Sequence, residues 1–141
     1  MTNTPSPEAL RVFHQAPFIK LLGLRLDAAA DGECTTSLVL AEHHLQHDGF
    51  VHAGVQATVA DHTAGTAAST LLRPGQIVLT AEFKINLLRP ARGDVLVCTA
   101  KVLKAGATLT VAESEVYCGS GGNNVLTAKA MITLAVVTPR Q

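Results

Sequence analysis

Apolar and polar residues alternate from residue 77 to 88, which is the clearest periodicity in the chain. A period of two is typical of a β-strand with one face packed against a core. The pattern places the apolar residues on one face: Leu79, Ala81, Phe83, Ile85 and Leu87. Five further apolar segments, bounded by turn-forming residues, are also predicted strands: 18–28, 33–40, 94–103, 107–117 and 125–137.

A different spacing runs from residue 53 to 72, where proline is absent and alanines recur every three or four positions. This spacing favours a helix whose small-residue face packs against a sheet, and residues 73–75 (Arg-Pro-Gly) end it. Gly65 inside this helix costs about 1 kcal/mol relative to alanine, so we expect another segment to approach it closely. A shorter helix is predicted to begin at Ser6 and to end before Pro17.

The predicted order of elements is a short helix, two strands, one long helix and four strands. Such a chain buries its apolar faces most economically as an antiparallel sheet curled around the long helix. The sequence therefore predicts an α+β fold of five to six strands around one central helix. Neither an internal repeat nor a linker is present, which predicts a single domain over residues 1–141, with residues 1–5 and 138–141 as loose termini.

Composition adds three expectations. The 11 Lys and Arg residues balance the 11 Asp and Glu residues, which argues against a nucleic-acid binder because such proteins need a basic surface. Only 16% of the residues are charged whereas 48% are hydrophobic, which indicates that part of the surface is buried against another subunit. The chain lacks an apolar run of about 20 residues and the features of a signal peptide, so we expect a cytoplasmic protein without membrane contact.

One acidic residue stands inside the predicted long helix. Asp61 lies among Val59, Ala60 and Ala64, with no basic residue three or four positions away. A partly desolvated carboxylate without a cation suits a general base or a nucleophile. The alternative is a solvated acid on an exposed helix face, which is the usual situation of an aspartate.

The start of the same helix offers a second chemical element. The backbone N–H groups near Ala53 and Gly54 lack partners within the helix and lie at the positive end of its dipole. They can stabilise the oxyanion that forms when a carbonyl is attacked, although ordinary capping is the alternative. Asp61 follows His52 by nine positions, and nine helical residues rise about 13 Å. If both elements act on one substrate, they should come from different subunits.

Two motifs carry a resemblance to a known family. Gln46 is followed six residues later by His52-Ala53-Gly54 and then by Val59-Ala60-Asp61. This pattern resembles the hot-dog-fold acyl-CoA thioesterases of the PaaI-like, phenylacetate-degradation group in the 4-hydroxybenzoyl-CoA thioesterase superfamily. The stretch from Glu82 to Ala91 resembles the third strand and turn of that family. The resemblance extends over nearly the whole chain and implies the hot-dog fold.

The resemblance implies hydrolysis of an acyl-CoA thioester to a carboxylic acid and free CoA, with neither a metal nor another cofactor. It implies Asp61 as general base or nucleophile, and the N–H of Ala53 as the group that polarises the thioester oxygen. Gln46 would position water or substrate, and His52 would order the turn and touch the substrate. Because the family builds each site across a dimer interface, a homodimer is the expected active unit and a homotetramer the expected assembly.

Three positions depart from the pattern of the family. Ala53 replaces the first glycine of a His-Gly-Gly turn and would resist a positive φ. The amide residue is Gln46 where many members have asparagine, and His62 follows Asp61 where threonine or serine is common.

Further residues are expected to bind the substrate. Gly54 and Gly65 are expected beside the acyl-CoA. The cations in or near the turns after two predicted strands are candidates for the CoA phosphates: Arg89, Arg92, Lys101 and Lys104. Exposed arginines and lysines are more often simply solvated, which is the alternative.

Three other interpretations stay open. His43, His44 and His47, with Asp61 or His62, could in principle hold zinc, although their spacing matches no metal motif. A hot-dog hydratase or dehydratase would pair an acid with a histidine, but Asp61 and His62 are adjacent and point about 100° apart on a helix. A non-catalytic acyl-CoA binding protein or sensor would use the same fold, and loss of the acid would favour it.

Overall fold

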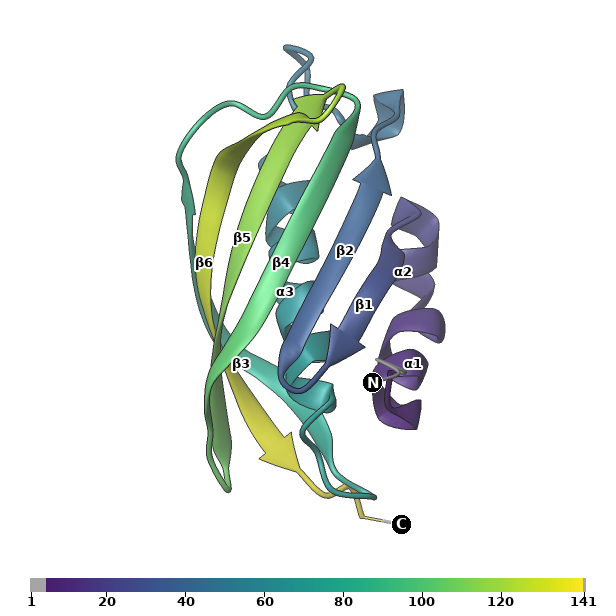
Figure 1. Cartoon of the computed structure of the whole chain (residues 1–141), viewed down its shortest axis with the longest axis vertical. Coiled ribbons are helices and arrows are strands. Elements are labelled where there is room, and N and C mark those ends of the chain that lie inside the picture. The colour runs from purple at the N-terminus through teal and green to yellow at the C-terminus, as the bar shows by residue number, and fades with distance from the viewer. Residues whose placement is uncertain (1–4, 141) are drawn as a thin grey trace.

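A six-stranded antiparallel sheet wraps around one long helix in the computed structural model, which describes residues 5–140 (Figure 1). Two short helices precede the sheet, and one 3-10 turn lies between the second strand and the long helix. The helices and strands are α1 (Pro7–His14), α2 (Pro17–Leu22), β1 (Arg25–Ala30), β2 (Glu33–Val39), η1 (Glu42–His44), α3 (Ala53–Ser69), β3 (Ile77–Leu87), β4 (Val95–Ala105), β5 (Leu109–Ser120) and β6 (Asn123–Val137).

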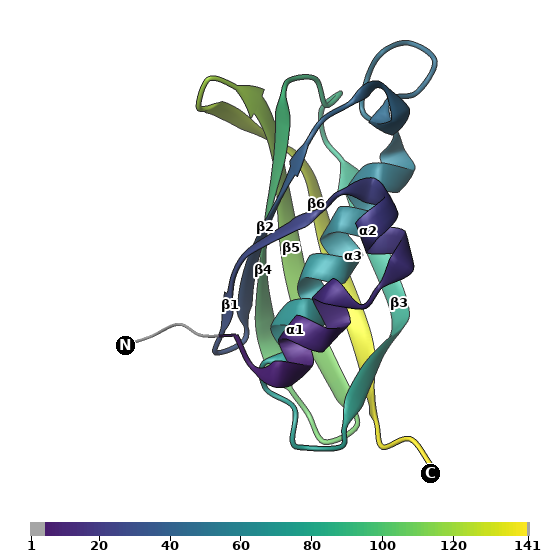
Figure 2. The same ribbon diagram turned by 90° about the vertical axis from the view of Figure 1, so that its right-hand side faces the viewer.

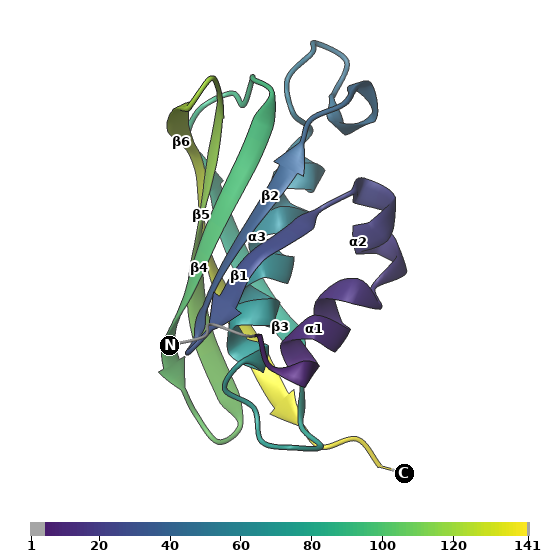
Figure 3. The same ribbon diagram turned by 45° about the vertical axis from the view of Figure 1, so that its right-hand side comes forward.

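The sheet has the strand order β1-β2-β4-β5-β6-β3, so β1 and β3 form its two edges. Every neighbouring pair is antiparallel. Helix α3 lies against one face of the sheet, and α1 packs on the side of α3 that faces away from the strands (Figures 2 and 3). This arrangement confirms the predicted α+β architecture and is the hot-dog fold that the resemblance implies.

Residues 18–22 are helical, so the strand predicted over 18–28 is wrong in its first half. Pro17 begins α2, although we expected it only to end α1. Proline is favoured at the first helical position because its fixed φ suits the helix and its missing N–H leaves no unpaired donor. Gly23 has a φ of 84° and ends the helix, with its N–H bonded to the carbonyls of Ile19 and Lys20.

A β-bulge in β3 corrects the predicted faces of that strand. The register with β6 shifts between Thr80 and Glu82, so Ala81 is the extra residue. Phe83, Ile85 and Leu87 share the face of α3, as predicted, but the bulge reverses the pattern before it. Leu79 therefore lies on the outer face of the sheet, and Thr80 pairs with the buried Leu134 and faces α3.

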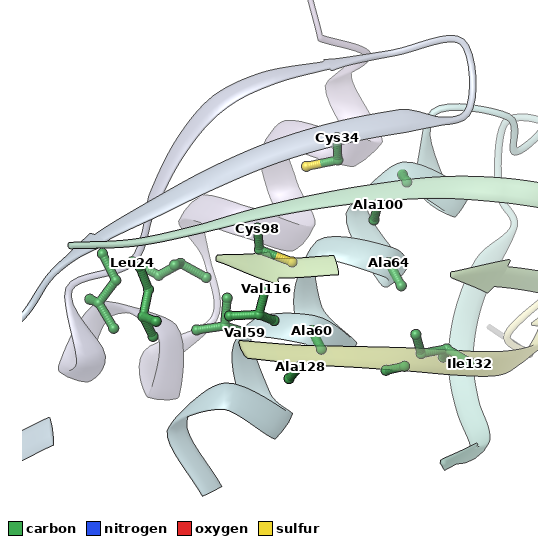
Figure 4. Packing of buried hydrophobic residues seen from close by; sticks show 14 of the residues in the cluster. Leu24, Cys34, Val59, Ala60, Ala64, Cys98, Ala100, Val116, Ala128 and Ile132 are labelled. Atoms are coloured by element: carbon green, nitrogen blue, oxygen red, sulfur yellow. The ribbon is translucent and has the colours of Figure 1, made fainter. Parts of the chain in front are cut away.

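Small side chains let α3 lie close to the sheet. Ala60 and Ala64 are fully buried and pack with residues such as Val116 and Ile132 (Figure 4). The threonine and serine hydroxyls of the helix bond carbonyls four residues earlier, which satisfies these polar groups inside the helix. They are Thr58, Thr63, Thr66 and Ser69. The small-residue helix predicted over 53–72 is thus confirmed, with its end at Ser69.

Two further features of the core are its thiols and Gly65. Cys34 and Cys98 belong to the core, and burial raises the pKa of both thiols to about 12. The predicted close approach at Gly65 is wrong within one chain, because an added Cβ would meet only Leu134 Cδ2, at an ordinary contact distance of 3.8 Å.

Pro5 and residues 138–140 lie outside the helices and strands. The other residues predicted as loose termini, 1–4 and 141, lie outside the described residues. None of the helices within residues 5–140 combines the length and the apolar character that a membrane span requires.

Candidate active site

His52 caps the N-terminus of α3. Its φ of −59° and ψ of 135° are extended, and its Nδ1 accepts the N–H of Gly54 at 2.9 Å. Nδ1 therefore holds a lone pair, and the ring proton lies on Nε2. A Cβ on Gly54 would lie 3.0 Å from that Nδ1, so the folded-back imidazole explains the glycine. The exposed ring leaves its Nε2–H free to donate to a ligand.

The N–H of Ala53 has no hydrogen-bond partner within the described part of the chain. Ala53 is the first residue of α3, and its φ is not positive. Among the non-glycine residues of 5–140, a positive φ occurs at Asp31. Alanine therefore fits this turn without the strain that a positive φ would cause. The result is an unpaired donor at the positive end of the helix dipole.

Gln46 closes the turn that leads into the helix. Its Oε1 accepts the N–H groups of Asp48 and Phe50, and its backbone N–H bonds the carbonyl of Phe50 at 2.7 Å. The side-chain oxygen is thus used within the turn, which leaves the amide nitrogen as the free end of the side chain. Arg92 stacks over the Phe50 ring at 5.7 Å from its centroid and braces the other side of the turn.

His44 anchors the same segment to α2 and is not available as a ligand. Its Nε2 donates to the carbonyl of Leu22 at 2.8 Å, and its Nδ1 accepts the N–H of Ala41 at 3.0 Å. Its backbone carbonyl also accepts the N–H of His52 at 2.9 Å. The described residues contain no group of three or more His, Cys, Asp or Glu arranged to hold a metal.

These elements surround a cleft of about 500 Å³ at the tip of α3. It is lined by Gln46, His52 and Ala53 on one side and by Leu87 and the turn of residues 88–91 on the other. Arg89 of this turn is held in place, because its Nη1 donates to the carbonyl of Leu126 at 2.8 Å. The lining residues include N–H donors but no carboxylate.

Asp61 lies elsewhere, on the face of α3 that meets β3. It is half-buried, and its Oδ1 accepts the hydroxyl of Thr80 at 2.7 Å. The bulge at Ala81 turns Thr80 toward the helix and so makes this contact. Within one protomer Asp61 therefore lies outside the cleft that contains Ala53. The rise of the helix predicted this separation.

His62 points away from Asp61 toward α1. Its ring packs on Phe13 with the centroids 5.3 Å apart. Burial lowers the pKa of His62, against smaller raising effects of Asp61 and of a hydrogen bond to the Val12 backbone. The Asp61–His62 pair thus lacks the shared geometry that a hydratase would need.

Two predicted substrate residues lie away from the cleft in one protomer. Gly65 is buried three turns along α3. Lys104 stands near the end of β4, at the hairpin to β5, whereas the cleft turn of residues 88–91 precedes the opposite end of β4. Gly54 and Arg89, in contrast, lie at the helix tip and in the cleft wall.

Sequence reasoning missed two residues of this region. The alternation predicts Thr80 on the outer polar face of its strand, and only the pairing with β6 reveals the bulge. Gln56 lines the cleft from α3 and is 3% exposed. Its spacing could have identified it, because it follows Ala53 by one helical turn on the same face.

Comparisons with known proteins agree with this geometry. The sequence profile of the Thioesterase superfamily matches residues 48–124, more than half of the chain. The crystal structure of a thioesterase family protein from Silicibacter pomeroyi is 35% identical, covers 94% of this chain and 99% of its own, and has a TM-score of 0.89.

Two sequence relatives support the same assignment. A Halobacterium salinarum protein with a provisional esterase name is 37% identical over 103 residues, which cover 70% of this chain and 68% of its own. Human acyl-coenzyme A thioesterase 13 is 33% identical over 94 residues, which cover 65% of this chain and 66% of its own. The chain therefore belongs to the thioesterase superfamily and is a thioester hydrolase with the hot-dog fold.

Proposed function

We propose that this chain hydrolyses acyl-CoA thioesters to the carboxylic acid and free CoA, as a PaaI-like member of its superfamily. The proposal is carried by one observation: helix α3 bears both the N–H donors and the carboxylate of a site, but at separate places. The tip of α3 presents N–H donors to a cleft without a carboxylate, and Asp61 on the same helix faces β3. The similarity to human acyl-coenzyme A thioesterase 13 supports CoA as the thiol.

The donors of the cleft suit a thioester carbonyl. The unpaired N–H of Ala53 lies at the positive end of α3, where it stabilises negative charge that develops on the carbonyl oxygen. The free amide nitrogen of Gln46 and the Nε2–H of His52 lie beside it and can hold the substrate or the attacking water. Arg89 in the opposite wall provides a positive charge for the CoA phosphates.

The acid comes from a second copy of the chain. Leu87 at one end of β3 lines the cleft, and Thr80 near the other end bonds Asp61. Seven residues of strand separate them by about 23 Å in one protomer. When two β3 strands pair in antiparallel fashion about a two-fold axis, the Leu87 end of one meets the Thr80 end of the other. Such a homodimer places Asp61 of the partner subunit next to the cleft.

The exposed edge of the sheet supports this dimer. Strand β3 is 11 residues long and forms one edge, and the unpaired backbone N–H and C=O groups of an edge strand can pair with another strand. Leu79, Phe83 and Leu87 on this strand are 57%, 41% and 48% exposed in the single chain. A partner strand beside β3, related by a two-fold axis, would lie next to Leu79 on the outer face and next to Phe83 and Leu87 on the α3 face. A homotetramer would need a second interface in addition.

The carboxylate of Asp61 can act by either of two balanced routes. As a general base, it removes a proton from water while the water oxygen attacks the thioester carbon; the oxyanion then collapses, and the CoA sulfur leaves and takes up the proton. As a nucleophile, it attacks the carbon itself and expels the CoA thiolate, and water then hydrolyses the mixed anhydride. Both routes use the same donors at the tip of α3.

Release of free thiol from aromatic, short-chain and medium-chain acyl-CoA esters tests the proposal. We expect turnover by the wild type and a decrease in kcat of about 100- to 10,000-fold for Asp61→Asn, with substrate binding and folding retained. Glu33→Gln, which neutralises an exposed acid on β2, is the matched control and should retain full activity. Near-normal turnover by Asp61→Asn would remove Asp61 from the mechanism. Binding of acyl-CoA without turnover by the wild type would identify a sensor.

A further inference from the structure

Gln56 is a large polar side chain in a helix built of small residues, and it is 3% exposed. Burial of an amide is unfavourable unless its polar atoms are hydrogen-bonded. The structure accounts for one of these atoms, because Oε1 accepts the hydroxyl of Thr127 on β6. The nitrogen has no such partner among the described residues. Gln56 Nε2 is therefore available to bind a ligand.

The hydrogen bonds of Thr127 indicate which end of the amide faces the cleft. The Thr127 hydroxyl lies 2.7 Å from Gln56 and 3.2 Å from the carbonyl of Val116. A hydroxyl has one proton, and about 2.7 Å is typical of O–H···O bonds, whereas N–H···O bonds are about 2.9 to 3.0 Å long. Thr127 therefore donates to the Gln56 oxygen, which turns the NH2 group the other way.

The nitrogen is accessible from the cleft. Gln56 is one of the residues that line it. A fully buried side-chain nitrogen or oxygen without a hydrogen-bond partner occurs, among the described residues, at His62 Nε2. The unpartnered nitrogen of Gln56 is not such an atom, so it is not enclosed in the core. Side chains of a helix lean toward its N-terminus, and a residue covers the turn before its own Cα. The amide of Gln56 thus lies over the turn that begins with Ala53.

We propose that Gln56 Nε2 is a second donor to the thioester oxygen, beside the backbone N–H of Ala53. This inference rests on the proposed function, since it concerns the same cleft and the same oxygen. An oxyanion accepts more than one hydrogen bond, and donors that are already oriented cost little reorganisation when the charge forms. Gln56 is then a catalytic residue that neither the motif nor the resemblance indicated.

Thr127 is the positioning residue for this donor. It is fully buried, and its backbone carbonyl accepts the N–H groups of Leu88 and Arg89 at 2.8 and 3.3 Å. One residue of β6 therefore orients the amide on α3 and also holds the turn in the opposite wall of the cleft. Loss of its hydroxyl should release the Gln56 amide without removing the turn contacts, which are made by the backbone.

The test compares four variants on an acyl-CoA and on the acyl-pantetheine thioester with the same acyl group. Gln56→Met keeps the shape without the donor, and Gln56→Glu exchanges the donor for an acceptor. We expect both to lower kcat about 10- to 100-fold with KM changed less than about threefold. Thr127→Val should lower kcat several-fold, and Thr127→Ser, which retains the hydroxyl, should restore it. Thermal unfolding of each variant shows whether it is folded.

The outcomes separate the two proposals. Full kcat in a folded Gln56→Met variant, or an effect confined to KM, overturns the role of Gln56. If Gln56→Met alone fails to fold, the contrast between Thr127→Val and Thr127→Ser decides, and equal kcat values overturn the role. Cleavage of acyl-pantetheine but not of acyl-CoA by the wild type rejects CoA as the thiol and leaves the Gln56 measurement valid on pantetheine. A wild type that cleaves neither overturns both.

Discussion

Proline at position 53 would delete one hydrogen-bond donor and little else. Proline lacks an N–H and is favoured at the first helical position, and His52 already has the extended conformation that a residue before proline adopts. We expect Ala53→Pro to be as stable as the wild type or more stable by up to about 1 kcal/mol. Its kcat should decrease about 100- to 1000-fold because one oxyanion donor is lost. Thermal unfolding and thiol release measure the two effects.

Ala53→Gly is the control, because glycine keeps the backbone N–H and removes only a methyl group. Its kcat should stay within a few-fold of the wild-type value. A folded Ala53→Pro variant that retains wild-type kcat would show that the thioester oxygen binds elsewhere. At this scale the sequence predicted unpaired N–H groups near Ala53 and Gly54, since a helix start requires them. It could not show that Gly54 would be paired with His52 while Ala53 stayed free, because that depends on one side-chain rotamer.

The bulge in β3 affects the orientation of the proposed catalytic carboxylate. It turns Thr80 toward α3, where the hydroxyl donates to Asp61 at 2.7 Å. Hydrogen bonds to a charged group contribute about 1.5 to 3 kcal/mol, so Thr80→Val should misorient the carboxylate and lower kcat about tenfold. Thr80→Ser should retain activity. Steady-state kinetics of both variants measure this effect, and equal kcat values for them would exclude the hydroxyl from orienting the acid.

Helix α3 was predictable because its alanines recur at helical spacing and Arg-Pro-Gly ends it. The segment 18–22 has no such spacing, and its apolar run fits a strand or a buried helix equally. The informative signals were Pro17 and Gly23, which fit the first position and the C-terminal cap of a short helix. The bulge at Ala81 has no local signal, since it exists only in the register with β6. The pattern of residues along the chain does not contain the pairing between distant strands, so it could not predict the bulge.

Gly65 gives a prediction about the stability of α3. Glycine within a helix is less favourable than alanine by about 1 kcal/mol, and a Cβ at this position would meet Leu134 at an ordinary contact distance. Gly65→Ala should therefore raise the free energy of unfolding by about 0.5 to 1 kcal/mol, measured by denaturant titration. A decrease would show instead that a segment of another subunit approaches Gly65 closely in the assembly.

At the scale of the whole molecule, the site is expected to exist only between two chains. The proposed two-fold axis through β3 repeats each half-site once per protomer, so a dimer holds two equal sites, each with Ala53 from one chain and Asp61 from the other. The sequence predicted this division from the rise of the helix alone. The structure adds a way for two chains to form such a site. Strand β3 carries Leu87 at the end near the cleft and Thr80 toward the end near Asp61, so antiparallel pairing of two β3 strands would bring the two halves together.

Mixing two inactive variants tests this division directly. Ala53→Pro protomers lack the donor and Asp61→Asn protomers lack the acid, so either variant alone should be nearly inactive. In a mixed dimer, the intact Ala53 of one chain meets the intact Asp61 of the other, which restores one of the two sites. Random exchange in an equal mixture makes half of the dimers mixed, so about a quarter of the wild-type activity should return. Thiol release after co-expression or after unfolding and refolding of the mixture measures the recovery. If each site were built within one chain, no pairing of these two variants could restore activity.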